Sequence, residues 1–170
     1  MKFFAKRAVV RQLNALELRS AFKPKAIRSL VFIYDTDLGF TEAQFEDMCR
    51  IFSPEISIIQ RVHCNMNKKM LEGVSKPHLH LQSLDWRGRI MSDDLLYVLQ
   101  QQYDLAVHFV DQVSLPLLSF SSQLNASFRI GPSSMDSRLN DLVLSPTLDF
   151  DTYCSDLKQY FKKIHPNEHT

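Results

Sequence analysis

The sequence has little glycine, with only four residues of this type in 170. They stand far apart, at Gly39, Gly73, Gly88 and Gly131. Loops that bind phosphate need several glycines close together, because the backbone must approach the anion. Neither the dinucleotide-binding pattern G-x-G-x-x-G nor the nucleotide-binding pattern G-x-x-x-x-G-K can be placed on this chain. The scarcity of glycine therefore argues against a nucleotide cofactor held by such a loop.

Cysteine is also scarce, and its three residues, Cys49, Cys64 and Cys154, are far apart and odd in number. No C-x-x-C pair is present, so the cysteines indicate reduced thiols in a cytoplasmic protein. No apolar run approaches the roughly 18 residues that a membrane span needs. The N-terminus lacks the apolar core and small-residue cleavage site of a signal peptide. The predicted location is the cytoplasm.

What the sequence does have is an uneven distribution of charge. The net charge is +1, yet residues 1–28 contain eight basic side chains and a single acid, Glu17, which gives this segment a charge of +7. The remainder of the chain is therefore acidic. Such an asymmetry is typical of a surface that meets an anionic partner. The basic residues are Lys2, Lys6, Arg7, Arg11, Arg19, Lys23, Lys25 and Arg28.

Residues 3–22 predict an amphipathic helix with Phe3, Val9 or Val10, Leu13 and Leu16 on its apolar face. Three interpretations of this helix are open. It packs on the domain and leaves its charges in water, it binds RNA, anionic lipid or an acidic protein, or it is an organelle-targeting peptide. Under the second interpretation, the candidate partner-binding residues are Lys2, Lys6, Arg7, Arg11 and Arg19.

The rest of the chain alternates between strand and helix patterns. Strands that alternate with helices imply right-handed crossovers and a mostly parallel sheet covered on both faces. We therefore predict an α/β fold, in which residues 26–170 form a single three-layer αβα domain with a Rossmann-like sheet of five to six strands. Residues 1–25 supply the basic helix, packed on the domain or extending from it.

Apolar runs rich in Val and Ile mark the strands, and a period of 3.6 residues marks the helices. Ile33, Ile58, Val107 and Ile130 are expected to be buried on central strands. The expected strands are 28–34, 55–63, 78–84, 103–110, 127–130 and 142–144. The expected helices after the first are one that Thr41 caps and Pro54 ends, and those at 92–102, 114–124 and 149–164.

The stretch Asp35-Thr36-Asp37 follows the first buried strand, where phosphotransferases of the haloacid-dehalogenase type carry a catalytic aspartate pair. That signature also needs Thr or Val four residues after the first Asp, and this chain has Gly39 there. A further acidic pair must hold Mg²⁺ at a strand end, whereas the other adjacent Asp pair of this chain opens a helix. We interpret the stretch as a polar turn between a strand and a helix.

His63, Cys64, His78 and His80 are of the residue types that bind zinc. Their spacing, H-C-x13-H-x-H, is not a recurrent zinc pattern, so we interpret them as ordinary surface and strand-end residues. No G-x-S-x-G surrounds any serine between residues 114 and 134, and no nucleophile–base pair can be proposed. We predict no catalytic residue set, no metal site and no cofactor.

Two stretches resemble known families. "YDLAVHFVDQVSLPLLSFSSQLNASFRIGP" and the closing "DLVLSPTLDFDTYCSDLKQYFKKI" resemble an uncharacterised family of small cytoplasmic bacterial proteins, and "LDWRGR" and "SLVFIYDTDLGF" fit its layout. That family has no assigned activity. Residues 103–132 also resemble the N-terminal domain of heptosyltransferase-like glycosyltransferases, where a "YDLVIDL" strand, a helix and an "RIG" strand follow each other. The second resemblance implies a Rossmann-like half domain, and 170 residues leave no room for the nucleotide-sugar domain of those enzymes.

In open α/β sheets, ligands bind beyond the carboxyl ends of the strands. The candidate ligand-binding residues at that edge are Asp35, Asp37, Asp85, Trp86, Arg87, His108, Gly131 and Ser133. This set is polar and mixed in charge, without a convergent catalytic group. The expected function is therefore a non-enzymatic binding or adaptor protein with a protein or RNA partner at the basic helix.

The alternative is a small-ligand or sugar-phosphate enzyme that needs a partner subunit. Convergence of Asp37, Arg87 and His108 in a pocket would favour this alternative. A first helix that exposes apolar or basic side chains would favour the adaptor.

Overall fold

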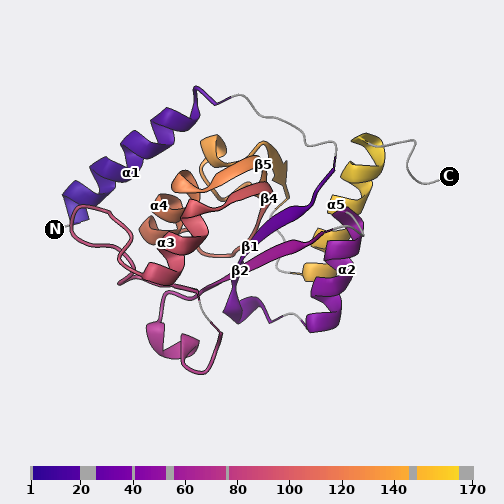
Figure 1. Ribbon diagram of the computed structural model, residues 1–170, viewed down its shortest axis with the longest axis horizontal. Helices are drawn as coiled ribbons and strands as arrows, with labels where there is room; N and C mark the ends of the chain where they lie inside the picture. The colour runs from indigo at the N-terminus through magenta and orange to yellow at the C-terminus, as the bar shows by residue number, and fades with distance from the viewer. Residues whose placement is uncertain are drawn as a thin grey trace.

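The structure, a computed structural model, describes residues 2–19, 26–39, 41–52, 56–75, 77–145 and 149–164. A central sheet lies between two groups of helices (Figure 1). The helices are α1 (Lys2–Leu16), α2 (Glu42–Phe52), α3 (Asp93–Gln100), α4 (Leu115–Gln123) and α5 (Phe150–Ile164). The strands are β1 (Ser29–Asp35), β2 (Ile58–Cys64), β3 (His78–Leu79), β4 (Gln102–Phe109), β5 (Asn125–Pro132) and β6 (Leu142–Leu144). Short 3₁₀ turns follow β1 (η1, Thr36–Leu38), β2 (η2, Lys68–Leu71) and β5 (η3, Ser137–Leu139).

The six strands pair in parallel in the order β3-β2-β1-β4-β5-β6. This is the strand order of the Rossmann fold. It confirms the predicted α/β class and the sixth strand, and the sheet is parallel throughout. The chain progresses outward from β1 in one direction and then from β4 in the other, so the order reverses between these two strands. In folds of this class the reversal marks the edge at which ligands bind.

Each face of the sheet is covered by its own helices (Figure 1). On β1, Val31 and Ile33 face one side, and Leu30 and Phe32 face the other, as the two-residue period of a strand requires. The first pair joins a buried cluster with side chains of α1, α3 and α4. The second pair joins a cluster with α2 and α5. Because both faces are buried, β1 reads as an unbroken apolar run.

Local sequence signals fix the ends of two helices. The predicted cap of α2 by Thr41 is present and forms a capping box, since Thr41 Oγ1 accepts from the Gln44 backbone N–H at 3.2 Å and Gln44 Oε1 accepts from the Thr41 N–H at 2.9 Å. Both interactions satisfy N–H groups that the first turn of a helix leaves without a partner. At α4, Ser114 Oγ accepts from the Leu117 N–H at 3.3 Å. Pro116 lies in the first turn, where its missing N–H has no cost.

Two expectations about element bounds and one about burial were wrong. The strand predicted at residues 78–84 spans only His78–Leu79, and the residues after it turn back toward α1. Because β3 pairs with β2 only at His63 and Cys64, the first half of β2 lies along the edge of the described sheet. Ile58 is therefore 55% exposed, whereas the other three residues expected in the core, Ile33, Val107 and Ile130, are fully buried.

The first helix ends at Leu16 rather than at residue 22. Residues 20–25, which include Lys23 and Lys25, lie outside the described residues. None of the helices in the described ranges is long and apolar enough to cross a membrane.

Candidate functional site

Helix α1 lies against α4 on one face of the sheet (Figure 1). Its buried stripe consists of Ala5, Val9 and Leu13, which are spaced four residues apart and therefore lie on one face of the helix. A hydrogen bond also joins α1 to α4, because Gln12 Oε1 accepts from the Ser122 hydroxyl at 3.1 Å. The core contact of α1 is thus built on small and medium side chains.

The orientation of α1 corrects the predicted apolar face. Leu13 is buried as expected, and of the alternatives Val9 and Val10 it is Val9 that is buried, whereas Phe3, also assigned to that face, and Val10 are 63% and 42% exposed. Phe4 is exposed as well, at 58%. The side of α1 that carries Ala5 is instead the one that a neighbouring loop approaches at Gly88. The outward face of α1 is therefore both apolar and basic.

The loop Leu84–Ile90 holds Trp86 beside α1. Its ends are joined by an antiparallel bridge between Leu84 and Ile90, and the Asp85 carboxylate accepts from the backbone N–H groups of Arg87 and Arg89 at 2.8 and 2.9 Å. These hydrogen bonds lower the pKa of Asp85, and the bond from the Arg89 backbone N–H has the largest effect. These contacts make the stretch a hydrogen-bonded turn.

Gly88 explains why the loop comes so close to α1. Its φ is +81°, a conformation that L side chains rarely adopt. A Cβ atom at this position would lie 3.1 Å from the Ala5 carbonyl oxygen and 3.3 Å from Ala8 Cβ. The Gly88 carbonyl in turn accepts from the Ser119 hydroxyl of α4 at 3.1 Å. Gly88 therefore joins the loop to α1 and α4 together.

This arrangement brings three exposed aromatic rings together. The Phe3 and Phe4 centroids are 5.9 Å apart, and the Phe4 and Trp86 centroids are 6.0 Å apart, both edge to face. Two guanidinium groups lie over rings of the set, Arg7 over Phe3 at 5.0 Å and Arg87 over Trp86 at 4.4 Å. Contacts of this kind are favourable because a cation is attracted to the face of an aromatic ring.

These side chains line a shallow groove of about 1100 Å³ along the outer side of α1, here called the α1 groove. Its lining includes four cations and no acid. No ion pair joins these four cations to any residue within the described ranges. The α1 groove is lined by Phe3, Phe4, Lys6, Arg7, Ala8, Val10, Arg11, Asn14, Trp86 and Arg87.

The groove unites residues from two predicted sets. Lys6, Arg7 and Arg11 come from the partner-binding set, and Trp86 and Arg87 from the ligand-binding set. The side chain of Lys2 lies outside the described residues. Phe4 was not among the candidates, and Phe3 and Val10 were expected to be inside. The four-residue spacing of Ala5, Val9 and Leu13 is the signal that could have shown this.

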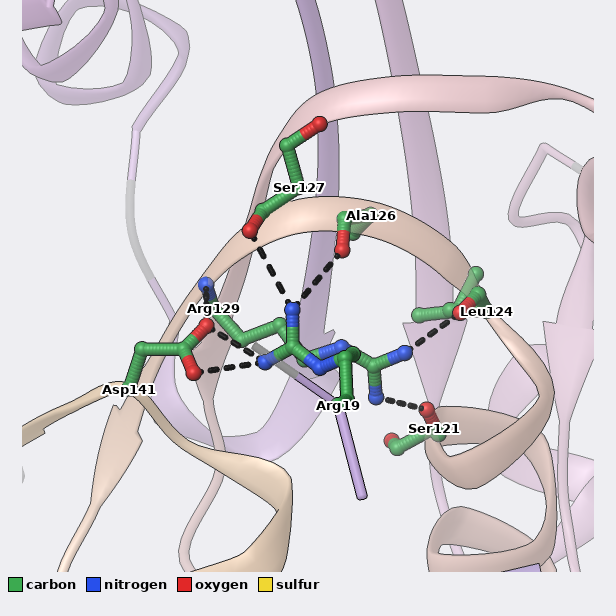
Figure 2. A network of polar contacts seen from close by, with 7 residues as sticks. All are labelled: Arg19, Ser121, Leu124, Ala126, Ser127, Arg129 and Asp141. Atoms are coloured by element: carbon green, nitrogen blue, oxygen red, sulfur yellow. Dashed lines mark hydrogen bonds and ion pairs between the residues drawn. The ribbon is translucent and has the colours of Figure 1, made fainter. Parts of the chain in front are cut away.

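Arg19, the fifth candidate for partner binding, makes its contacts inside the protein (Figure 2). Its Nη2 donates to both carboxylate oxygens of Asp141 at 2.6 Å. Its Nη1 donates to the Ala126 and Ser127 carbonyls of β5 at 3.2 and 3.1 Å. Four hydrogen bonds thus attach the segment after α1 to the sheet, and the charge of Arg19 is neutralised there.

A second guanidinium lies next to this ion pair (Figure 2). Arg129 is only 2% exposed, and its side chain donates to the Ser121 and Leu124 carbonyls at the end of α4. The last carbonyls of a helix lack partners within it and carry a partial negative charge, so a cation is favourable there. Burial, and then the nearby Arg19, lower the pKa of Arg129 to about 10.

Asp35 and Asp37 stand at the carboxyl end of β1 and form a turn with Asn65. Asp35 Oδ1 accepts from the Asp37 N–H at 3.3 Å, and Asp37 Oδ1 accepts from Asn65 Nδ2 at 2.8 Å. Asn65 Nδ2 also donates to Thr36 Oγ1 at 3.0 Å. Burial, followed by the nearby Asp37 and Asp111 carboxylates, raises the pKa of Asp35. The arrangement is that of a hydrogen-bonded turn.

The remaining ligand-binding candidates lie apart from one another. His108 is fully buried, with its Nδ1 3.1 Å from the Ile130 carbonyl oxygen and its Nε2 2.9 Å from Ser121 Oγ. Gly131 is buried against the Asn140 side chain, and Ser133 is an exposed turn residue after β5. Burial lowers the pKa of His108 to about 4, so the imidazole is neutral at pH 7. His108 is a core residue rather than part of the accessible edge.

Of the histidines considered for zinc, His63 lies in a hydrogen-bonded chain with Tyr34 and Ser75. His63 Nδ1 lies 2.6 Å from the Tyr34 hydroxyl oxygen, and His63 Nε2 lies 3.2 Å from Ser75 Oγ. Among the described residues, no group of three or more His, Cys, Asp or Glu is placed to hold a metal ion. Burial, and then the adjacent His78, lower the pKa of His63 to about 4. A histidine with so low a pKa is a weak general base at neutral pH, so we interpret the chain as structural.

A second hollow, of about 590 Å³, lies at the carboxyl edge of the sheet. It is here called the edge cleft, and Trp86 lines it as well as the α1 groove. Its walls come from the segments after β2, β3 and β4, together with Ala5 of α1. The edge cleft is lined by Ala5, Met66, Leu81, Leu84, Asp85, Trp86, Gln112, Val113, Ser114, Leu115 and Pro116.

Comparison with known proteins bears on the whole chain. A search of curated proteins and a search of solved structures each find no match. The predicted resemblance to an uncharacterised family is supported at the level of the family, because a family model matches residues 2–164, almost the entire sequence. The match includes α1, the Leu84–Ile90 loop and all six strands. The chain belongs to DUF6913, a family of unknown function.

Proposed function

We propose that this protein is a non-enzymatic binding protein that docks single-stranded RNA in the α1 groove. The observation that carries the proposal is the alternation of exposed aromatic rings and cations along one surface without an acid. Single-stranded nucleic acids are bound by this combination, because bases stack on aromatic faces and cations neutralise the phosphates.

The aromatic rings favour RNA over an acidic protein partner. Charge attraction to an acidic protein needs only the four cations. Phe3, Phe4 and Trp86 expose 63%, 58% and 49% of their surface in addition, and exposed rings are costly unless something covers them. The rings lie edge to face with centroids about 6 Å apart, so they present faces in different directions to bases of one RNA strand.

The alternative function, an enzyme for a small ligand or a sugar phosphate, draws less support. Asp37 is hydrogen-bonded to Asn65, Arg87 lies over Trp86 and His108 is fully buried, so these three side chains do not converge. An adaptor with an exposed basic helix is the better explanation of the same surface.

The test is the affinity of a fluorescent single-stranded RNA of about twelve nucleotides, measured by anisotropy over a range of salt concentrations. Four cations that neutralise phosphates predict a slope of log K against log salt of about −3, at about −0.7 per phosphate. The charge reversal Lys6→Glu, Arg7→Glu and Arg11→Glu should weaken binding at least tenfold and flatten the slope.

The control variant reverses three exposed lysines outside the groove, Lys68→Glu, Lys69→Glu and Lys158→Glu, and changes the net charge equally. It should retain at least half of the wild-type affinity. Equal loss in both variants would overturn the assignment to the α1 groove.

A second pair of variants, Phe4→Leu and Trp86→Leu, separates RNA from an acidic protein. Each should weaken RNA binding by roughly 1–3 kcal/mol, the contribution of one stacked base. A polyglutamate peptide or an anionic vesicle that binds the wild type more tightly than RNA does would overturn the RNA assignment.

A further inference from the structure

The edge cleft lies where the fold class places ligands. Its walls are the segments that follow β2, β3 and β4, and β4 is one of the two strands at which the sheet order reverses. Its volume of about 590 Å³ lies within the range of small-molecule sites. The described residues that follow β1 form a turn with Asn65 and do not line the edge cleft.

The lining of the cleft specifies the chemistry of a ligand. Most of it is apolar, and no cation is included. The one carboxylate, Asp85, accepts three hydrogen bonds from its own loop, which hold it in the charged form. A phosphate or another anion is therefore unfavourable in the cleft, because the lining offers it no cation and Arg89, next to the cleft, is already paired with Asp85.

The remaining polar groups are neutral. Ser114 Oγ accepts from the Leu117 N–H, so its own hydroxyl hydrogen is left to donate to a ligand. Gln112, exposed at the mouth, carries a carboxamide that both donates and accepts. One hydroxyl and one amide in an apolar cleft beside an indole suit a flat ring with hydrogen-bonding groups on its edge.

We propose that the edge cleft binds one uncharged heteroaromatic ring of the nucleobase type. The ring comes either from a free nucleoside or from an RNA strand that lies in the adjoining α1 groove, and in the second case the inference rests on the proposed function. Trp86 joins the two sites, because it lines both and contacts Phe4 of α1. In this arrangement the cations of the α1 groove bind the phosphate backbone of the RNA, and the edge cleft binds one of its bases.

The chain offers a direct reporter, since Trp86 is its only tryptophan. Its fluorescence emission is measured during titration with adenosine, with uridine, with an RNA oligonucleotide and with an abasic strand of equal length. Val113→Phe narrows the cleft, because Val113 lies in its wall and is 37% exposed. Val143→Phe makes the same change on β6, where Val143 is 48% exposed and does not line the cleft.

Entry of a free nucleoside predicts a saturable change in emission in the wild type and in Val143→Phe, and none in Val113→Phe. If a base of a bound RNA strand enters the edge cleft, Val113→Phe should weaken RNA binding at least fivefold. The affinity for the abasic RNA strand should then stay unchanged.

RNA that binds the wild type and Val113→Phe equally, with no response to either nucleoside, would overturn the cleft inference and leave the proposed function standing. A nucleoside response that Val113→Phe removes, without RNA binding in the α1 groove, would sustain the cleft and overturn the RNA proposal.

Discussion

Four described basic residues of the N-terminal segment, Lys6, Arg7, Arg11 and Arg19, lie in two regions that differ in the contacts made by the charged groups. Arg19 lies next to Arg129 beside β5, where one carboxylate and several carbonyl oxygens accept from them. Lys6, Arg7 and Arg11 lie along α1 and make no ion pair with a described residue. The same residue type, within the same 28 residues, thus stabilises the fold in one region and remains available in the other.

The comparison shows that net charge in a segment does not by itself locate a binding surface. Burying a guanidinium is costly unless acceptors surround it, and two carbonyl oxygens accept from the Nη groups of Arg129, although its buried Nε has no acceptor among the described residues. An exposed guanidinium contributes little to stability. Exposure and the lack of acids, rather than charge, distinguish the α1 groove.

The largest effect is expected from the removal of the shared carboxylate. Asp141→Ala leaves Arg19 and the backbone N–H of Arg129 without their acceptor. Loss of one partner of a largely buried ion pair should lower the free energy of unfolding by about 3 kcal/mol in urea melts. Combined with Arg19→Met, the loss should be smaller than the sum of the two single variants, and additive values would contradict the coupling.

The interior region should also give the protein a dependence on pH. The folded pKa of His108 is about 4. An unfolded histidine has a pKa of about 6.5, so the unfolded state takes up a proton first as the pH falls. Stability is therefore complete above about pH 6.5 and decreases toward about pH 4, by up to about 3 kcal/mol.

His63 should also make the protein less stable as the pH falls, because its folded pKa is likewise lowered to about 4. Urea melts at a series of pH values should show a shallower loss of stability for His108→Gln than for the wild type. Parallel curves for the two proteins would show that His108 does not contribute.

A loss of stability of intermediate size is expected at the Leu84–Ile90 loop, which holds Trp86 beside α1. Gly88→Ala should cost roughly 1–2 kcal/mol, because a side chain is strained at positive φ and meets the Ala5 carbonyl. Gly73→Ala is the matched control, since Gly73 has a φ of +82° and nothing within 4 Å of the added atom. Thermal melts in which Gly73→Ala costs as much would show that the contact with α1 is unimportant.

The smallest effect on stability is expected in the α1 groove. Reversal of Lys6, Arg7 and Arg11 to glutamate should change the free energy of unfolding by no more than about 0.5 kcal/mol, because these side chains are exposed. The same substitution at Arg19 should destabilise the fold strongly, because Arg19→Glu places a second acid beside Asp141. A large loss in the α1 variant would mean that its cations stabilise the fold, and the contrast between the regions would fail.

Much of the fold could be predicted because its signals are local. Leu30 to Ile33 form an apolar run that only a strand buried on both faces explains, and Thr41 with Gln44 marks a helix start. The site could be predicted only in part. Trp86 and Arg87 were placed among ligand-binding candidates and Lys6, Arg7 and Arg11 among partner-binding candidates, yet their union in one groove depends on contacts between distant segments.

The sequence by itself determined the α/β class, the alternation of strands and helices and the basic character of the N-terminal segment, because these follow from composition and periodicity. Only the tertiary structure decided which way α1 faces and which cations remain in water. On α1, apolar side chains occupy more than one face, so periodicity alone did not choose between Phe3 or Val10 and Ala5. In the folded chain the loop at Gly88 lies against the Ala5 side of α1, so this side is buried, and Phe3, Phe4 and Val10 are left exposed in the groove that Trp86 also lines.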